Sequence, residues 1–305
     1  MARLYILDTL YHIFRAYHAL PPTLTARDGR PTNAVYGALG IVRSLFKTER
    51  VEHCVAVFES LEPTFRSELD PEYKANRPEA PAGLKIQIPL VLELFEKLGI
   101  PTLAVSGYEA DDVMATLARR AREAGQGATI VSNDKDLAQV LALGGDVELL
   151  RLSGTGKQAK AERVGPEGVQ ELFGVPAGLI PSWLALRGDP VDNIKGVAGI
   201  GQKTAVKLLL EGGDLPTLLE HPERGGRFAQ ALRDERERLL RDLEIATVRL
   251  DVPLPFEGLP LESFRPGPVR EGAADFLRGL DMKSLLKTLE ETLLPDPTIG
   301  DLWGA

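Results

Sequence analysis

The sequence is poor in cysteine and has no long apolar run. Its 305 residues contain one cysteine, Cys54, which excludes an internal disulfide and the class of secreted disulfide scaffolds. No stretch reaches the ~18 apolar residues that a membrane-spanning helix needs. Residues 1–14 are interrupted by Asp8 and His12, so they predict a strand and not a signal peptide. We therefore expect a cytoplasmic protein without a membrane partner.

Basic residues are in the minority. The chain has 36 Lys and Arg against 44 Asp and Glu, a net charge of -8. This balance argues against nucleic acid as a partner, provided that the acidic groups are scattered. In this sequence the acidic groups are not scattered. The 44% hydrophobic and 26% charged fractions are typical of a globular protein, and the length predicts about two domains.

Short apolar runs alternate with helical spacing in the first half of the chain. The predicted strands are residues 4–7, 54–58, 103–105 and 129–131, and the predicted helices are 34–46, 88–98 and 113–124. This alternation predicts an α/β fold with a mostly parallel central sheet and flanking helices. Only helical segments follow residue 165. We place a boundary near Val164, between a core (1–164) and a helical region (165–305).

Residues 61–87 form a long insertion between the second predicted strand and the next helix. The insertion is rich in proline and contains four basic and five acidic residues. Long insertions on an α/β scaffold serve as lids or binding loops, or they are solvated excursions. Composition alone leaves both interpretations open.

Acidic residues follow all four predicted strands. In a mostly parallel sheet these strand ends lie on one edge, where such folds bind ligands. Two like charges ~5 Å apart repel by about 3 kcal/mol at an effective dielectric of ~20, so the cluster needs a cation. Oxygen ligands without His or Cys select Mg²⁺, Mn²⁺ or Ca²⁺. The residues are Asp8, Glu59, Glu109, Asp111, Asp112, Asp134 and Asp136.

Each acidic pair also has a structural interpretation. Asp111 and Asp112 suit the first turn of a helix through its dipole, and Asp134 and Asp136 suit a turn or a cap. Acid at all four strand ends is much less expected by chance. Together the residues therefore favour a site for two divalent ions, which act on phosphoryl centres.

A further acidic cluster and a glycine turn lie in the helical region. Asp189 and Asp192 precede Gly199-Ile-Gly201, a turn that opens a helix carrying Lys203 and Lys207 one turn apart. Backbone N–H groups at such a turn suit a DNA phosphate, although an ordinary bend between helices explains it too. Residues 154–157 (Gly-Thr-Gly-Lys) predict a β-turn and not a nucleotide-binding loop.

These motifs together resemble the bacterial 5′-nuclease family, which includes the 5′-to-3′ exonuclease domain of DNA polymerase I and, more distantly, flap endonucleases. The resemblance covers nearly the whole chain, to a helix expected at 276–289. It rests on Asp8, Pro63-Thr-Phe-Arg66-x-Glu68, Tyr73-Lys74-Ala-Asn-Arg77, Gly107-Tyr-Glu109-Ala-Asp111-Asp112, Asp134-Lys-Asp136-Leu and Gly188-Asp189 through Lys203-Thr-Ala.

The resemblance implies a PIN-like nuclease core, a helix-three-turn-helix and a two-metal phosphodiesterase. Mg²⁺ or Mn²⁺ would be held by Asp8, Glu59, Glu109 and Asp111 on one side and by Asp134, Asp136 and Asp189 on the other, with Asp112 and Asp192 alongside. Lys74 and Arg66 would stabilise transition-state charge from residues 61–87, which would form an arch for a single-stranded 5′ end. DNA would be bound by Phe14, Arg77, Gly199, Gly201, Lys203, Thr204 and Lys207.

The implied activity is 5′-to-3′ exonuclease and flap endonuclease action in primer removal and repair. The expected substrate is DNA with a 5′ flap or a 5′ end at a duplex junction. A monomer, a monovalent cation at the helix-three-turn-helix and a DNA polymerase partner are further expectations.

Glu59 stands where the family usually has Asp. This departure keeps open one alternative, a DNA-binding protein of this fold with weak or no catalysis. A second alternative is a ribonuclease of the related PIN-like fold, which would not need the element from Gly199 to Lys207.

Overall fold

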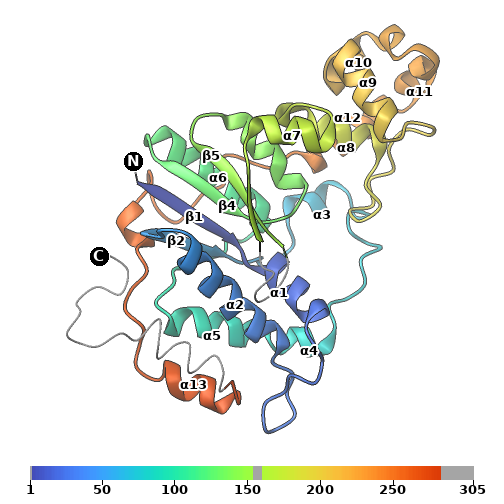
Figure 1. The fold of residues 1–305 in the computed structure, drawn as a ribbon. Helices are drawn as coiled ribbons and strands as arrows, with labels where there is room; N and C mark the ends of the chain where they lie inside the picture. Colours follow the sequence, from blue (N-terminus) through green and yellow to red (C-terminus); the bar gives the residue numbers. More distant parts are fainter. Residues whose placement is uncertain (1, 154–159, 283–305) are drawn as a thin grey trace.

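A six-stranded sheet in the order β3-β2-β1-β4-β5-β6 lies at the centre of the molecule (Figure 1). The computed structural model describes residues 2–153 and 160–282. The strands are β1 Arg3–Asp8, β2 His53–Val57, β3 Thr102–Leu103, β4 Gly127–Val131, β5 Val147–Ser153 and β6 Lys160–Val164. Neighbouring strands are parallel except β5 and β6. The predicted mostly parallel sheet is confirmed.

Strands β5 and β6 were not predicted from the sequence. In β5, Leu149 and Leu150 are both buried, so the strand does not alternate cleanly between apolar and polar residues. In β6 only Val164 is buried, because this strand lies at the antiparallel edge of the sheet. Neither strand therefore presents a clear period of two.

Alternate residues of β1 face two helical layers. Leu4 and Ile6 pack in the layer of α6 (Ala110–Glu123), and Tyr5 and Leu7 pack in the opposite layer. That opposite layer contains α1 Thr9–Ala19, α2 Asn33–Thr48 and α5 Ile88–Lys97, and Figure 1 shows α2 and α5 together on one side of the sheet. The three predicted helices are confirmed. Residues 1–14 are a strand only as far as Asp8, because α1 begins at Thr9.

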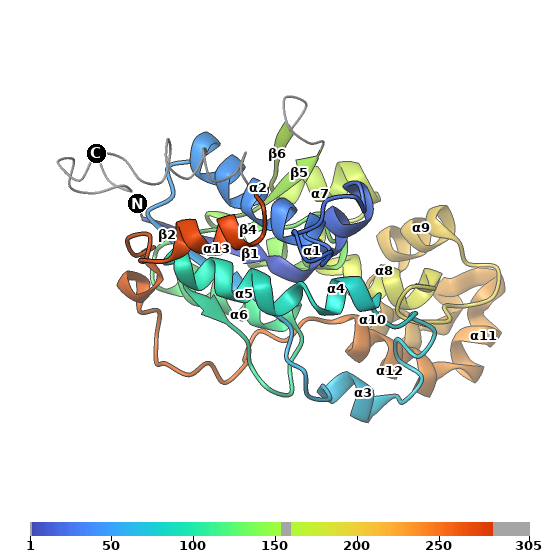
Figure 2. The same ribbon diagram turned by 90° about the horizontal axis from the view of Figure 1, so that it is seen from below.

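Short helices build the region that follows the sheet. They are α7 Pro166–Phe173, η3 Ala177–Leu179, α8 Ile180–Arg187, α9 Gln202–Gly212, α10 Leu215–Glu220, η4 Pro222–Phe228, α11 Ala229–Asp234 and α12 Arg236–Ala246. Helices α9, α10 and α11 lie together at one end of the molecule (Figures 1 and 2). The predicted helix-three-turn-helix is α8, the loop 188–201 and α9.

No single helix of the described residues has the length and apolar character to cross a membrane. The pair Pro166–Phe173 and Ala177–Arg187 meets that test only jointly, across a bend of 52°.

After α12 the chain returns to the core as a strap, residues 247–282. The strap contains η5 Leu261–Phe264 and α13 Ala273–Gly279, which lies beside α5 (Figure 1). Gly267 N–H donates to Gly99 O at 2.8 Å. Gly99 has φ +67°, and a Cβ there would lie 2.6 Å from Gly267 O, so this approach requires glycine. Residues 154–157 lie outside the described residues. The helix expected at 276–289 ends earlier, because α13 stops at Gly279 and Asp281 has φ +55°; residues 283–289 lie outside the described residues.

The insertion 61–87 is ordered against the helical region. It contains α3 Phe65–Leu69 and α4 Ala82–Lys85. Asn76 Nδ2 donates to Pro190 O at 2.7 Å, and Asn193 Nδ2 donates to Glu72 O at 2.8 Å. The insertion thus contacts the loop that carries Asp189 and Asp192.

Candidate metal centre and nucleic-acid interface

Asp8 ends β1 at the carboxyl edge of the sheet and is buried. Its carboxylate accepts hydrogen bonds from Ser132 Oγ at 2.6 Å and from Tyr11 N–H at 3.2 Å, the second of which caps α1. Burial raises the pKa of Asp8 to about 7, and Asp134 and Glu59 add to the rise. Asp8 is therefore a buried carboxyl group that lies near two other carboxylates.

Asp111 and Glu59 reach the same edge from neighbouring elements. Burial raises the pKa of Asp111 well above its usual value, with repulsion from Asp134 and Asp8. Burial also raises the pKa of Glu59, which follows β2 and accepts a hydrogen bond from Ala110 N–H at 3.0 Å. The structure therefore brings the acids of β1, β2, β4 and α6 together, as expected from the sequence.

A second acidic group joins the core to the helical region. Asp136 begins η1 (Asp136–Leu143) after β4, and Asp189 and Asp192 follow α8. Carboxylate oxygens of these three residues all lie within 4.8 Å of one another. Burial raises the pKa of Asp136 to about 7, and the nearby Asp134 carboxylate contributes.

The loop of Asp189 and Asp192 is closed by a backbone pair. Asp189 N–H donates to Ile194 O at 2.8 Å, and Ile194 N–H donates to Asp189 O at 2.9 Å. Gly188 and Gly196 pack where this loop closes, and a Cβ on Gly196 would lie 2.4 Å from Gly188 N. The two aspartates are therefore presented by a rigid turn.

Lys135 supplies a positive charge within the second group. Its Nζ lies 2.7 Å from Asp189 Oδ2 and 3.3 Å from Asp136 Oδ1. These carboxylates raise the pKa of Lys135 despite its partial burial, so it stays protonated. The beginning of this segment is fixed by Asp134, which accepts from Asp136 N–H at 2.9 Å.

Glu109 is held by the insertion. Lys74 Nζ lies 2.7 Å from Glu109 Oε1, and Tyr73 Oη donates to Glu109 Oε2 at 3.0 Å. The backbone of Lys74 has φ +56°, a left-handed conformation that residues other than glycine rarely adopt. The surrounding bonds, including Lys74 N–H to Asp192 O at 3.2 Å, hold this strained residue facing the acids.

Arg66 and Asp112 form a buried pair beside the acidic edge. Arg66 is 2% exposed, and its Nη1 and Nη2 donate to the two Asp112 oxygens at 2.6 and 2.8 Å. Asp112 also accepts from Glu109 N–H at 3.1 Å, which closes the first turn of α6. Asp112 therefore pairs with Arg66. It does not belong to the group of Asp136, Asp189 and Asp192, whose carboxylate oxygens lie within 4.8 Å of one another.

Two further predicted residues lie around the edge. Arg77 pairs with Asp192, and its Nε donates to Val191 O at 3.3 Å. Phe14 of α1 is 47% exposed, with its ring centroid 4.7 Å from that of His18. The predicted base-stacking ring is thus accessible.

The glycine turn opens α9 as expected. Gly199 has φ +80°, and Gly201 is the N-cap of α9 with its backbone exposed. Lys203 and Lys207 are exposed on α9, Thr204 is half-buried, and neither lysine forms an ion pair within the described residues. The turn therefore presents two basic side chains beside the exposed backbone of Gly199 and Gly201.

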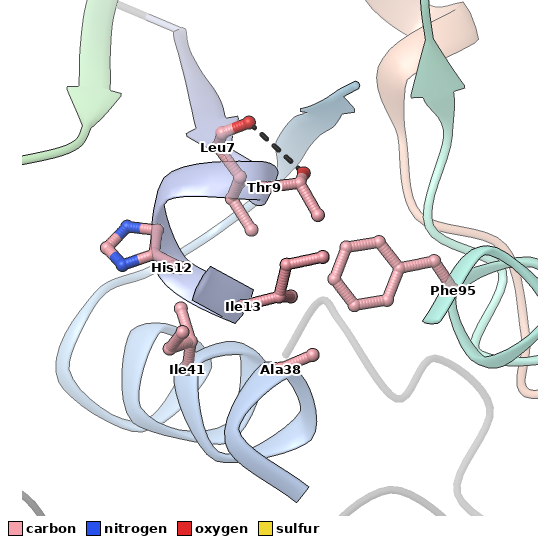
Figure 3. Close-up of a pocket in the computed structure, with 7 residues that line it drawn as sticks. All are labelled: Leu7, Thr9, His12, Ile13, Ala38, Ile41 and Phe95. Atoms are coloured by element: carbon pink, nitrogen blue, oxygen red, sulfur yellow. Dashed lines mark hydrogen bonds between the residues drawn. The ribbon is translucent and has the colours of Figure 1, made fainter. Parts of the chain in front are cut away.

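A small hollow lies behind the acidic edge, between α1, α2 and α5 (Figure 3). It has a volume of about 10 Å³ and is lined mainly by apolar groups, including Ile13 and Phe95. This is at the lower limit for a single water, so the hollow is a packing defect and no substrate site. His12 borders it and donates from Nε2 to Val131 O at 2.9 Å.

The parts played by Ser132, Tyr73, Lys135 and Gln139 were not predicted from the sequence. Lys135 had a signal, because it stands between two acids in Asp134-Lys-Asp136. No such signal marked Gln139, because its partners Ala246 and Val248 lie more than 100 residues away in the chain.

Two family models match this chain over nearly all of the residues described above. The 5′-3′ exonuclease N-terminal resolvase-like domain matches residues 3–174, and the 5′-3′ exonuclease C-terminal SAM fold matches residues 175–268. The chain belongs to the 5′-3′ exonuclease family. Its resemblance to the bacterial 5′ nucleases is confirmed.

Relatives of this 5′-3′ exonuclease family member include whole proteins and parts of larger ones. The chain is 37% identical to the 5′-3′ exonuclease of Aquifex aeolicus over 292 residues, covering 95% of this chain and 96% of the relative. It is 41% identical to DNA polymerase I of Pseudomonas aeruginosa over 298 residues, covering 94% of this chain and 31% of the relative. The chain thus spans about a third of that polymerase.

Solved structures share the fold. T5 5′-exonuclease with bound zinc ions matches with a TM-score of 0.64 and 22% identity, over 96% of this chain and 98% of that chain. The catalytic core of Rad2 in complex with DNA substrate matches with a TM-score of 0.55 and 18% identity, over 96% and 92%. These matches confirm the α/β core with a helical region.

The donor set of this exonuclease-family chain fits divalent cations. Asp136, Asp189 and Asp192 offer only oxygen atoms and lie close enough to share one ion. Burial, with repulsion from Asp134, raises the pKa values of Asp8 and Asp136. A bound cation would relieve that repulsion.

Proposed function

We propose that this protein is a structure-specific 5′ nuclease that hydrolyses DNA phosphodiesters with two divalent ions, Mg²⁺ or Mn²⁺, as a 5′-to-3′ exonuclease and flap endonuclease. The observation that carries this proposal is the position of the second acidic group, in which Asp136 of the core meets Asp189 and Asp192 of the helical region. A scissile phosphate at this junction would lie between the catalytic core and the region that holds the duplex.

The two acidic groups divide the ligands. Asp8, Glu59 and Asp111 would hold or surround one ion, with Glu109 beside them, and Asp134, Asp136, Asp189 and Asp192 would hold the other. When bound, the ions lower the pKa of water and stabilise charge on the attacking and leaving oxygens. The residues of the chain then have the tasks of holding the substrate and of placing charge around the phosphate.

Lys74 is the residue that we assign to transition-state charge. Its ammonium lies at Glu109, next to the acidic edge, and the insertion fixes its backbone. A preorganised cation of this kind stabilises charge that develops on the phosphate oxygens. Lys74 would exchange Glu109 for the phosphate when DNA enters.

For Arg66 and Asp112 we propose a supporting role. The guanidinium is 2% exposed and donates to Asp112 and to two backbone carbonyls, so its donors are already used. This burial does not suit the direct phosphate contact that the resemblance implied. Arg66 would instead hold the insertion that carries Lys74.

The helical region would hold duplex DNA by its backbone. Gly199 and Gly201 present N–H groups, and Lys203, Thr204 and Lys207 follow them on α9. Such contacts position DNA without reading its sequence. We assign a monovalent cation to this turn, base stacking to Phe14, and a single-strand contact to Arg77 in an arch formed by residues 61–87. Two bound divalent ions would offset much of the acidic charge where the DNA approaches, although the net charge of the chain is -8.

We further propose that the protein acts as a monomer in the cytoplasm, in primer removal and repair, beside a DNA polymerase. The lone buried thiol of Cys54 suits a reducing compartment.

The proposed function is tested with a 5′-labelled double-flap DNA, with and without Mg²⁺, reading product length. Metal-dependent release of short 5′ products is expected. Binding without cleavage would favour the DNA-binding alternative that Glu59 motivated, and cleavage of the matched RNA alone would favour the PIN-like ribonuclease.

A further inference from the structure

Three buried side chains of the core bind consecutive residues where α12 ends. They are Arg66, Asp112 and Gln139, which are 2%, 0% and 7% exposed. Their partners are backbone groups of residues 245–249, where the strap begins. We call this set of contacts the joint.

Gln139 connects the joint to the backbone of Asp136. Its Nε2 donates to Ala246 O and to Asp136 O, both at 2.9 Å. Its Oε1 accepts from Val248 N–H at 2.9 Å. One side-chain amide therefore connects the backbone of Asp136 to the chain on both sides of Thr247.

Arg66 and Asp112 contribute the rest of the joint. Arg66 Nε donates to Ile245 O at 2.8 Å, and its Nη2 donates to Thr247 O at 3.0 Å. Asp112 Oδ1 accepts from Arg249 N–H at 2.8 Å. Each of the five residues 245–249 thus contributes one backbone group to the joint: a carbonyl from 245, 246 and 247, and an N–H from 248 and 249. Buried backbone groups need such partners, so the joint has few alternative arrangements.

The joint is placed to control the geometry of the second acidic group. Helix α12 packs against α8, and Asp189 follows α8 directly (Figure 1). Asp136 belongs to the core and is tied to the joint through its own carbonyl. Helix α8 also packs directly on η1 and on α9, so the contacts of α12 act together with those of η1 to place Asp189 and the glycine turn of α9 relative to Asp136.

We propose that Gln139 is a positioning residue that sets the spacing between the duplex-holding helices and the metal centre, and thereby selects which phosphodiester is cut. This inference rests on the proposed function. A displacement of about 1 Å at a reacting centre lowers a rate by as much as ~100-fold, so a small shift of α12 has a measurable effect.

The test compares Gln139→Met, which removes all three bonds at similar volume, with Thr116→Val. Thr116 of α6 is a matched control, because its Oγ1 donates to Arg249 O at 3.4 Å and accepts from Val252 N–H at 3.2 Å. It ties the strap to the core without contacting Asp136. Each variant is measured for melting temperature, for flap-DNA affinity in chelator, and for single-turnover rate and product length in Mg²⁺.

We expect Gln139→Met to cut roughly 10-fold more slowly or worse, and to spread its products over neighbouring phosphodiesters, while affinity in chelator stays within about twofold. Thr116→Val should lower the melting temperature and keep the parental rate and single product. A Gln139→Met protein with the parental product and a rate no lower than that of Thr116→Val would overturn the inference.

Two further outcomes can be distinguished from failure of the inference itself. If the parental protein does not cut DNA, the proposed function fails first, and the inference fails with it. If Gln139→Met does not fold, Gln139→Asn takes its place, because the amide is retained but is one methylene too short to reach both sides of the joint. A parental product pattern from a folded Gln139→Asn would equally overturn the inference.

Discussion

Lys135 Nζ lies 2.7 Å from Asp189 Oδ2, so a lysine of the core pairs with an aspartate of the helical region. The same ammonium lies 3.3 Å from Asp136 Oδ1. Arg77 pairs with Asp192, so two positive charges lie beside this group of three carboxylates. The repulsion that remains is lowered when a divalent ion binds, and such binding would stabilise the fold.

Mn²⁺ or Mg²⁺ is expected to raise the melting temperature, because the ions bind only where the folded chain gathers the carboxylates. Asp136→Asn should reduce that rise. Asp275→Asn is the matched control, since Asp275 is exposed on α13 and its substitution should leave the rise unchanged. Identical thermal scans in metal and in chelator would contradict the metal centre.

Replacing Lys203 and Lys207 together by Ala should weaken binding to duplex DNA of any sequence. The loss of two phosphate contacts should lower the slope of log affinity against log salt by roughly 1.8. Arg43 and Lys47, a basic pair with the same spacing on α2, provide the control double variant. An unchanged slope for the α9 variant would show that the turn has only a structural role.

Lys74→Ala is expected to lower the single-turnover rate by at least ~100-fold, the scale of losing one preorganised charge stabiliser. Flap affinity should change far less, because the residue acts on the transition state. Lys85→Ala removes a lysine of the same insertion that pairs with Glu79, and it should retain the parental rate. Weaker binding with an unaltered rate would assign Lys74 to positioning of the substrate.

Glu59 is expected to be a working ligand, direct or through water. Glu59→Gln keeps the side-chain size and the acceptor for Ala110 N–H, yet removes the charge, so it should lower the rate in both ions. Glu59→Asp should reduce a relative preference for Mn²⁺, which tolerates a longer ligand better than Mg²⁺ does. Parental cleavage by Glu59→Gln over a full metal titration would make Glu59 a bystander.

His12 makes the fold sensitive to acid. Burial lowers the pKa of His12 to about 4, below the ordinary value of 6.5, so the unfolded chain binds more protons between these values. The contribution of neutral His12 to the free energy of unfolding is complete above pH 6.5, and at pH 5 it is lower by about 2 kcal/mol. His12→Gln should remove this part of the pH dependence. Denaturant unfolding at pH 7 and pH 5 measures it, and equal losses in the two proteins would contradict the prediction.

The sequence predicted those strands and helices that have a clear local pattern of apolar residues. The β1 strand is a short apolar run and the α6 helix has helical periodicity. Acid after each predicted strand indicated an acidic edge, because parallel strands end on one side of the sheet. The β6 strand was missed because only Val164 is buried.

The contacts of the site were harder to predict. Asp112 resembles a ligand in Glu109-Ala-Asp111-Asp112, but it points to Arg66 and Arg249 N–H instead. On a helix, consecutive residues point about 100° apart, so Asp111 and Asp112 cannot share one direction. The sequence alone shows that the two side chains point in different directions. The partners of Asp112, Arg66 and Arg249 N–H, are distant in the chain and can be identified only from the folded structure.

The strap determines how the helices α7 to α12 are connected to the core. Because residues 247–282 return to the core and α13 packs beside α5, the helices α7 to α12 are inserted between two segments of one folded unit. A single break in the backbone within the strap would leave α13 bound to the core by its buried Leu277 and by the Gly99–Gly267 pair. Separating helices α7 to α12 as a fragment of their own would require two cuts. A chain truncated after α12 would expose the apolar face that α13 covers.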